Sequence, residues 1–357
     1  MNTTPPSYEQ PPSLRLREGT GIRSTPNYLR QFLIYLVLIT LFYLALRNAP
    51  LIDIWSTLSQ LHLWQILVLF VLNSSVIFAI TARWWIIIRA DNPSVPFLPL
   101  VRYRLSTFGL SYFTPGPQVG GEPLQVYYLQ QNHGITFARS TAAVIMDKLV
   151  EFLSNSILIV AGLTAMVRVG MISGNGMLAF GSLIPLAAIL VIPPVHLALL
   201  YRGRYPLSGL LRAASPILGN RSWMRLLIVS ERMAASFTRR RLSAVLGAFC
   251  FSMIALAGTL LEYSLMTSFL NADLSFAQNL AGLTSALLAF ILPLPGGLGA
   301  LEASQVYALT SMGYAPAFGI SLSLLIRTRD LMNAGLGLLL VGKLIHRIST
   351  FGSLIRR

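Results

Sequence analysis

The sequence has 357 residues, of which 54% are hydrophobic and only 11% are charged, and its formal net charge is +15. Several windows stay apolar for about 20 residues, the length that a helix needs to cross the hydrocarbon core of a bilayer, so a soluble globular class is excluded. The single cysteine, Cys250, excludes an internal disulfide and has no histidine cluster beside it, so we expect neither redox chemistry nor a metal site. The basic residues stand beside apolar spans, so the charge does not indicate a nucleic-acid partner.

The apolar windows predict an all-α, polytopic membrane protein with about six membrane-spanning helices. These lie near 30–47, 63–88, 140–167, 177–200, 243–270 and 316–342. The N-terminal stretch 1–27 is rich in Pro, Ser, Thr and Arg and is expected to be a disordered cytoplasmic tail, not a signal peptide. A single transmembrane domain then covers 28–345, and a basic cytoplasmic tail follows at 346–357.

Two further apolar segments, 105–131 and 277–309, are interrupted by Pro and Gly. Lys and Arg gather before the first span, after the second, between the fourth and fifth and after the sixth, which predicts that both termini are cytoplasmic. Six spans satisfy this charge pattern only if each interrupted segment leaves the membrane on the side it entered. We therefore predict two re-entrant helical hairpins, which are tolerated at membrane depth where protein or a polar cavity surrounds them.

The two hairpin segments repeat one pattern 180 positions apart. The identical pairs are Pro115/Pro295, Gly116/Gly296, Glu122/Glu302, Gln125/Gln305, Val126/Val306, Tyr127/Tyr307 and Leu129/Leu309. In the predicted topology the two copies, about 63–167 and 243–342, run in opposite directions through the membrane. Inverted repeats with interrupted segments at corresponding places are typical of transporters with a site near the midplane.

The hairpin turns are expected to bring helix N-termini into the membrane. The turn residues are Pro115, Gly116, Gly120, Gly121, Pro295, Gly296, Gly297 and Gly299. Proline ends the incoming half-helix and glycine allows the reversal, so the chain restarts with free amide groups that favour an anion such as a lipid phosphate. Glu122 and Glu302 follow these turns, and each either binds a ligand or a proton or caps the amides of its own turn.

Four polar residues recur at the same offsets after the glutamates: Gln125, Gln305, Tyr127 and Tyr307. Each glutamine shares a helix face with its glutamate, whereas each tyrosine lies more nearly opposite. They are candidates for substrate contact, and packing of the hairpin against a neighbouring helix is the alternative.

The spans that follow the hairpins carry ionisable residues, which are costly inside a membrane unless they pair or line a wet cavity. These are Asp147, Lys148 and Glu151 in the first repeat and Arg327, Arg329 and Asp330 in the second. At the offset of 180 positions, Asp147 in the first repeat is equivalent to Arg327 in the second. We expect the charged groups to face one central cavity between the hairpins. Ion pairs across the repeat, contact with a lipid head group and pairing within one helix stay open as their roles.

A basic cytoplasmic loop at 201–242 contains nine arginines from Arg202 to Arg241. Apolar residues such as Trp223, Leu226 and Val229 stand among them, as in a helix at the membrane interface. The arginines either set the topology or recruit anionic lipid from the inner leaflet.

Three motifs resemble a known family: Gly-Glu-Pro-Leu in the first hairpin, Leu-Pro-x-Pro-Gly-Gly-Leu-Gly-x-x-Glu in the second and the Asp147-Lys148 region. They are similar to the flippase-like transmembrane domain of lysylphosphatidylglycerol synthases and their stand-alone relatives, over about 30–345. The resemblance implies a bacterial or archaeal protein of the plasma membrane. Such a protein would move a lipid between leaflets, either a phospholipid, for example an aminoacylated one, or a polyprenyl-phosphate-linked lipid. The synthases add a soluble aminoacyl transferase domain that has no counterpart before Arg357, so we do not expect lysine transfer.

Three classes of function follow from the sequence. A lipid flippase explains the inverted repeat, the hairpins and the buried charges together. A membrane-embedded head-group transferase would use Glu122, Glu302 or Asp147 as a base, although no nucleotide loop or other cofactor motif accompanies them. The third class is a non-transporting, lipid-binding partner of a lipid-modifying enzyme, and an oligomer is compatible with all three.

Overall fold

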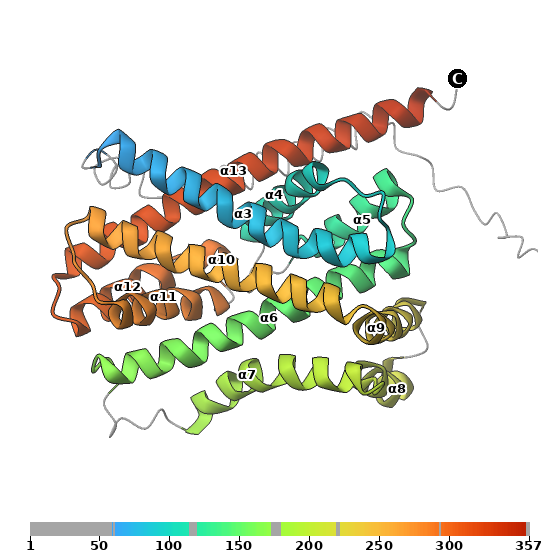
Figure 1. Ribbon diagram of the computed structural model, residues 1–357, viewed down its shortest axis with the longest axis horizontal. Coiled ribbons are helices and arrows are strands. Elements are labelled where there is room, and N and C mark those ends of the chain that lie inside the picture. The colour runs from blue at the N-terminus through green and yellow to red at the C-terminus, as the bar shows by residue number, and fades with distance from the viewer. Residues whose placement is uncertain are drawn as a thin grey trace, which may run out of the picture.

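The computed structural model describes residues 59, 61–113, 120–172, 180–218, 222–292 and 294–354, and all regular structure in these residues is helical (Figure 1). The elements are α3 (Leu63–Asp91), α4 (Phe97–Phe113), α5 (Glu122–His133), α6 (Phe137–Arg168), α7 (Phe180–Tyr201), α8 (Pro206–Leu218), α9 (Ser222–Arg240), α10 (Leu242–Phe269), α11 (Phe276–Ile291), the one-turn helix η1 (Pro295–Gly297), α12 (Ala300–Ser311) and α13 (Pro316–Leu354). The expected first span, at 30–47, and the N-terminal tail lie outside the described residues.

Three of the described helices, α3, α6 and α10, are long and apolar enough to cross a membrane. They coincide closely with the spans expected at 63–88, 140–167 and 243–270. Their outward side chains include Val71, Ile157 and Ile254, which are exposed and apolar. An exposed apolar surface of this kind is expected where a protein meets lipid, so the chain is a helical membrane protein.

Helix α13 differs from the expectation at its C-terminal end. It continues to Leu354, well past the expected end of the last span at 342 and through most of the expected tail at 346–357. A helix satisfies its own backbone hydrogen bonds, so it continues past the end of an apolar window until the sequence breaks it.

The two repeats have the same order of helices: α3, α4, α5, α6 and then α10, α11, α12, α13. α3 packs along α10, its counterpart, and α4 packs on α13 as α11 packs on α6. Figure 1 shows α3 antiparallel to α10, and α6 antiparallel to α13. The first helix of each short pair therefore lies against the last helix of the other repeat.

The short helices form two pairs that lie towards opposite ends of the long helices (Figure 1). In the first pair, Asn132 at the end of α5 donates a hydrogen bond from Nδ2 to the hydroxyl of Tyr103 near the start of α4, at 3.0 Å. In the second, Leu309 near the end of α12 belongs to the same buried cluster as Leu283 in the first half of α11. In each pair the chain thus returns towards the point where the pair began.

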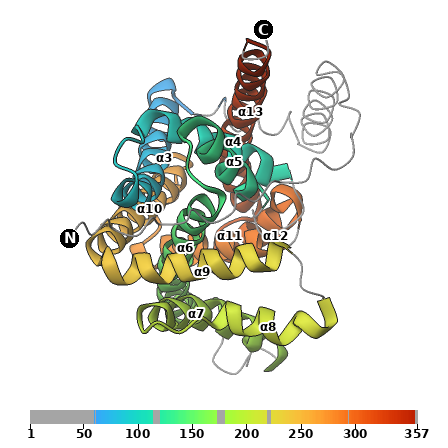
Figure 2. The same cartoon turned by 90° about the vertical axis from the view of Figure 1, so that its right-hand side faces the viewer.

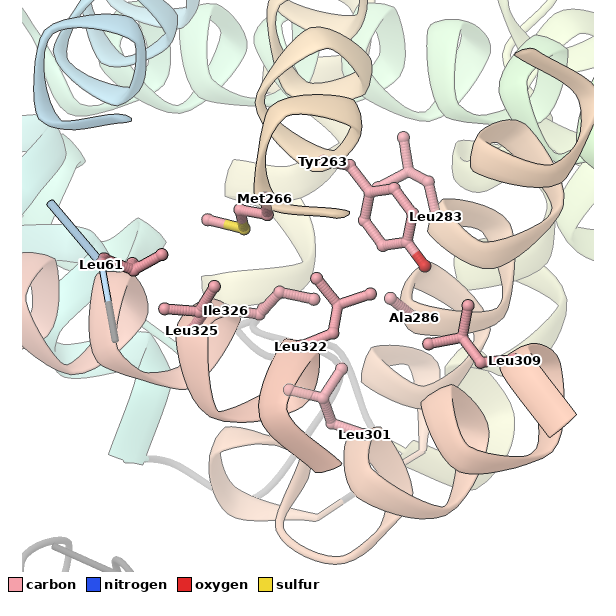
Figure 3. Packing of buried hydrophobic residues seen from close by; sticks show 10 residues of the cluster. All are labelled: Leu61, Tyr263, Met266, Leu283, Ala286, Leu301, Leu309, Leu322, Leu325 and Ile326. Atoms are coloured by element: carbon pink, nitrogen blue, oxygen red, sulfur yellow. The ribbon is translucent and has the colours of Figure 1, made fainter. Parts of the chain in front are cut away.

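A hydrophobic core joins the second pair of short helices to the long helices. Figure 3 shows its buried side chains converging from α10, α11, α12 and α13. Its members include Met266 on α10, Ala286 on α11, Leu301 on α12 and Leu322 on α13. Burial of this apolar surface holds α11 and α12 against the helices that carry the charged residues described below.

Small residues allow the helices of different repeats to approach closely. A Cβ added at Gly162 on α6 would overlap the side chain of Thr284 on α11. A Cβ added at Gly337 on α13 would overlap the backbone of Leu105 on α4. Close backbone approach at small residues is a common way to pack helices in a membrane, where the hydrophobic effect contributes little between them.

The basic loop expected at 201–242 forms α8 and α9, which lie beside one another at one end of the molecule, with α9 crossing α6 (Figure 2). Ala234, Ala235 and Phe237 of α9 are buried against α6, α7 and α10. Glu231 accepts hydrogen bonds from the amides of Leu207 and Ser208 and so caps α8. This segment is therefore a packed part of the fold as well as a source of positive charge.

Candidate functional site

Buried ion pairs form two clusters, one in each repeat. In the first cluster, Arg83 on α3 donates to both carboxylate oxygens of Asp147 on α6, from Nε at 2.7 Å and from an Nη at 3.2 Å. Arg104 on α4 also donates to Asp147, at 2.7 Å. Asp147 is 0% exposed, and bidentate contact with arginine is the geometry that best offsets the cost of burying a carboxylate. Asp147 thus joins α3, α4 and α6.

The outer part of the first cluster is centred on Lys148. Its ammonium lies 3.2 Å from Glu122 at the start of α5 and 3.1 Å from Glu151 one turn along α6. Glu122 also accepts a hydrogen bond from the amide of Gly120 at 2.7 Å. The Glu122 carboxylate therefore caps its own turn and pairs with a cation of the following helix at the same time.

The second cluster repeats this arrangement at the equivalent glutamate. Glu302 accepts a hydrogen bond from the amide of Gly299 at 2.9 Å and another from Nε of Arg327 on α13 at 2.8 Å. The side chain of Arg327 is 2% exposed and that of Glu302 is 28% exposed. The carboxylate is thus reached from outside the protein while its guanidinium partner is not.

Further charged groups of the second cluster surround Arg329. This residue pairs with Glu262 on α10, at 3.0 Å, and with its neighbour Asp330, at 2.9 Å. Asn333 on α13 donates to Asn73 on α3 at 2.9 Å, so the amides of the two repeats meet beside these charges. The second cluster therefore connects α3, α10, α12 and α13.

The two glutamines at equivalent positions differ in their surroundings. Both side chains are completely buried. Gln305 accepts from the hydroxyl of Tyr263 at 2.7 Å and donates to the carbonyl of Gly282 at 3.2 Å and to Ser285 at 3.0 Å. Gln125 has no hydrogen-bond partner among the described residues. The repeat is thus symmetric in sequence at this position and asymmetric in its bonding.

The model of one protein family, described as the lysylphosphatidylglycerol synthase TM region, matches residues 31–337. This match covers most of the chain. The chain belongs to this family. No curated protein and no solved structure matches it. Both clusters and both pairs of short helices lie within the part of the chain that the family covers.

Of the candidate residues in this family member, the structure gathers Glu122, Asp147, Lys148 and Glu151 in the first cluster and Glu302, Arg327, Arg329 and Asp330 in the second. It does not bring the two tyrosines to them. Tyr127 packs with the aromatic core around Tyr128, and Tyr307 is 56% exposed and donates to the carbonyl of Met171. Helix geometry accounts for this, because a residue five positions after the glutamate lies on another face.

Of the three roles left open for these charges, ion pairs across the repeat are not what the structure shows. Among the described charged residues of the two repeats, each ion pair joins two residues of the same repeat. Asp147, for example, pairs with Arg83 and Arg104. Hydrogen bonds between described residues of the two repeats have at most one charged partner. Arg83 donates to the uncharged Ser252, and Asn333 donates to Asn73. Arg83 and Arg104 belong to the same repeat as Asp147 and each lies 2.7 Å from its carboxylate, so these two guanidinium groups already neutralise its charge.

Several members of these clusters were not among the sequence candidates: Arg83, Arg104, Glu262, Asn73 and Asn333. Arg83 and Glu262 stand inside apolar windows, and an ionisable residue within a span is itself a signal of a buried partner. Arg104 is one of the basic residues that follow the second expected span, where a charge on the cytoplasmic side is expected, but it is 7% exposed and pairs with Asp147. Asn73 and Asn333 could not be recognised in the same way, because an uncharged amide within an apolar window does not by itself indicate a buried charged partner.

The structure describes some of the predicted turn residues and not others. Pro115 and Gly116 lie outside the described residues. Gly121 donates its amide to Ser111 and sits so close to Thr107 that a Cβ would overlap its carbonyl. Gly296, Gly297 and Gly299 all have positive φ angles of 56° to 77°, which supports their interpretation as the residues that reverse the chain. Among the described residues no group of His, Cys, Asp and Glu could hold a metal ion.

Proposed function

We propose that this protein moves a lipid with an anionic head group, either a phospholipid or a polyprenyl-phosphate-linked lipid, between membrane leaflets by alternating access. Its family indicates a function connected with membrane lipids. The movement of a lipid between leaflets and the location in the plasma membrane are our proposal.

The observation that carries the proposal is the shared bonding of Glu122 and Glu302. Each glutamate is bonded to its own turn and to a cation on the last helix of its own repeat. The first helix of each short pair packs on the last helix of the other repeat. Each short pair is therefore held between the two repeats, and moving one repeat against the other would shift both pairs in opposite senses. Such a mirror-related change is what alternating access requires.

Two partly exposed cations give an anionic head group a place to bind. The side chains of Lys148 and Arg329 are each 21% exposed, whereas Arg83 and Arg327 are almost completely buried. A lipid phosphate at Lys148 would compete with Glu122 and Glu151 for the ammonium. We expect this competition to loosen the first hairpin, which links binding of the lipid to movement of the repeat.

In this proposal α4 with α5 and α11 with α12 are re-entrant hairpins that enter from opposite faces, and both termini are cytoplasmic. The contact of Asn132 with Tyr103 supports the return of the first pair to the side it entered. Single cysteines at Arg102 and Gln131, both exposed, test it in a background with Cys250 replaced. We expect both to be labelled from the cytoplasmic side, and labelling from opposite sides would contradict the hairpin.

Transport itself is tested by exchange of a labelled lipid between leaflets of proteoliposomes, for the wild type and for Glu122→Gln and Glu302→Gln. Glutamine still accepts the amide hydrogen bond of the turn but cannot form the ion pair. We expect each variant to slow lipid movement in both directions, because the two glutamates occupy equivalent places. Exchange at the wild-type rate in both variants would contradict the role of the glutamates, and no exchange by the wild type with any anionic lipid would contradict transport.

The same variants separate transport from catalysis. A transferase has one reaction centre, so only one glutamate would be essential and its loss would leave an unmodified lipid in the membrane. Asp147 is poorly suited to act as a base because it is 0% exposed and bound by two guanidinium groups. Lipid analysis of cells that carry each variant is expected to show no new or missing species, and a change that follows one glutamate would favour the enzyme.

A further inference from the structure

The two buried clusters differ in their balance of charge. The first holds three carboxylates, Glu122, Asp147 and Glu151, and three cations, Arg83, Arg104 and Lys148. The second holds three carboxylates, Glu262, Glu302 and Asp330, but among the described residues only two cations, Arg327 and Arg329. The first is therefore neutral, whereas the second has one negative charge in excess. An uncompensated charge inside a membrane protein is costly, so the second cluster needs a further positive charge.

Glu262 is the carboxylate in the second cluster with the fewest bonds. Glu302 is bonded to a backbone amide and to Arg327, and Asp330 accepts twice from Arg329. Glu262 is 1% exposed, its Oε2 accepts a hydrogen bond from Arg329 at 3.0 Å, and the Asn73 amide lies beside the carboxylate. Its Oε1 has no hydrogen-bond partner among the described residues. A buried carboxylate oxygen without a donor is stabilised when it carries a proton, because the charge is removed and the oxygen becomes a donor itself.

Among the described residues, Arg329 is the cation beside Glu262. On α13 the charged groups that act on it are Arg329 and Asp330, and on α3 the neighbouring polar group is the Asn73 amide. α11 carries no titratable side chain. On α6, residues 147–151 belong to the first cluster, and the two arginines near its ends are exposed. Arg329 is therefore shared between two carboxylates, and the other group beside Glu262 is the uncharged amide of Asn73.

We propose that Glu262 is a proton-binding site and that the bound proton moves together with the lipid. This rests on the proposed function, because it identifies the ion coupled to the same transport cycle. The carboxylate takes one proton from water on the side to which the site is open and releases one proton to the other side. An anionic head group at Arg329 would raise the negative excess further, so its binding requires the uptake of a proton at Glu262.

The proton site is tested without transport by infrared spectroscopy of the purified protein in lipid nanodiscs. We expect the wild type to show the carbonyl band of a protonated carboxylic acid, and Glu262→Gln to lose it. Asp273→Asn removes an exposed carboxylate in the turn after α10 and is expected to keep the band. A wild type without the band, or a band that persists in Glu262→Gln, would overturn the proposal.

Coupling is tested in proteoliposomes that carry a pH gradient and an internal pH indicator. At one proton per lipid, a gradient of about one pH unit drives up to about a tenfold lipid asymmetry between leaflets, since about 1.4 kcal/mol corresponds to a factor of ten. We expect wild-type protein to show this dependence, and Glu262→Gln to exchange lipid without it. The coupling would be contradicted if lipid exchange by the wild type did not depend on the pH gradient, or depended on a sodium gradient instead.

The two proposals fail in distinguishable ways. If the wild type moves no lipid under any gradient, transport is contradicted while the infrared band still decides whether Glu262 binds a proton. If the wild type exchanges lipid and the band is absent, transport stands and the proton site is wrong. The wild-type measurements do not depend on the variant, so they decide the question even if Glu262→Gln fails to fold.

Discussion

The ring of Tyr112, at the end of α4, lies against Gly296 at the turn between α11 and α12. A Cβ added at Gly296 would lie 2.8 Å from Cζ of this ring, and Gly296 has a φ of 56°. Tyr112 directly precedes the first hairpin turn in the sequence, and Gly296 belongs to the second. The turn regions of the two repeats therefore touch, which is expected if both reach the middle of the molecule from opposite ends.

Replacing Gly296 with alanine is predicted to destabilise the protein for two reasons. Alanine at positive φ is strained by about 1 kcal/mol or more, and its Cβ would collide with the Tyr112 ring. Gly299→Ala is the matched control, because Gly299 has a φ of 77° but nothing within 4 Å of the added Cβ. We expect thermal unfolding in detergent to show a larger loss for Gly296→Ala than for Gly299→Ala.

A double-mutant cycle isolates the contact itself. Combining Gly296→Ala with Tyr112→Ala removes the ring that the new Cβ would meet, so the two losses are expected to be less than additive. Strictly additive losses would show that strain alone explains the effect and that the two turns do not touch.

Asp147→Asn is predicted to lower stability by about 3–5 kcal/mol, because the buried Arg104 guanidinium loses its carboxylate and Arg83 keeps only its pair with Glu151. The control is Asp91→Asn, whose carboxylate pairs with Arg241 at 3.7 Å with both side chains more than half exposed. Exposed pairs contribute about 0–1 kcal/mol, so this change should have little effect. Equal unfolding temperatures for the two variants would mean that the Asp147 pairs do not support the fold.

The glutamines offer a matched comparison at equivalent positions of the two repeats. Gln305→Leu leaves the buried Tyr263 hydroxyl without its acceptor and removes the hydrogen bonds to the Gly282 carbonyl and Ser285, which still bond to each other, and it is predicted to cost about 1–3 kcal/mol. Gln125→Leu removes no hydrogen bond to the described residues, so it should preserve stability. If Gln125 contacts the lipid, this variant is expected to slow exchange at unchanged unfolding temperature. A large loss of stability in Gln125→Leu would assign it a structural role instead.

Gly162→Ala is predicted to push α6 away from α11, because the new Cβ would overlap Thr284. Gly247→Ala is the control on α10, where the nearest side chain, that of Ile86, leaves ordinary van der Waals space at 3.7 Å. Alanine is the better helix former by about 1 kcal/mol, so Gly247→Ala should be neutral or stabilising. We expect Thr284→Ala to restore part of the stability lost in Gly162→Ala, and no restoration would mean that the loss arises elsewhere.

The sequence alone predicted the positions of α3, α6 and α10 and the interruption of each repeat at its glycine-rich turn, and it offered the capping of these turns by Glu122 and Glu302 as one alternative, which the structure shows. These features are local: a run of apolar residues long enough for a bilayer, or glycine at a reversal, has its effect wherever the rest of the chain lies. It also indicated which family the chain belongs to, because the turn motifs are continuous in the sequence.

Only the tertiary structure decided the partners of the charged residues. Asp147 and Arg327 are equivalent in sequence, yet one is held by Arg83 and Arg104 and the other by Glu302. Gln125 and Gln305 likewise share a motif but differ in bonding, because Tyr263 on α10 replaces Arg83 at the corresponding place on α3. A side chain bonds to whatever lies within about 3 Å in space, and that neighbour comes from helices that are distant in sequence. The excess negative charge at Glu262 follows from this pairing and is invisible until the helices are packed.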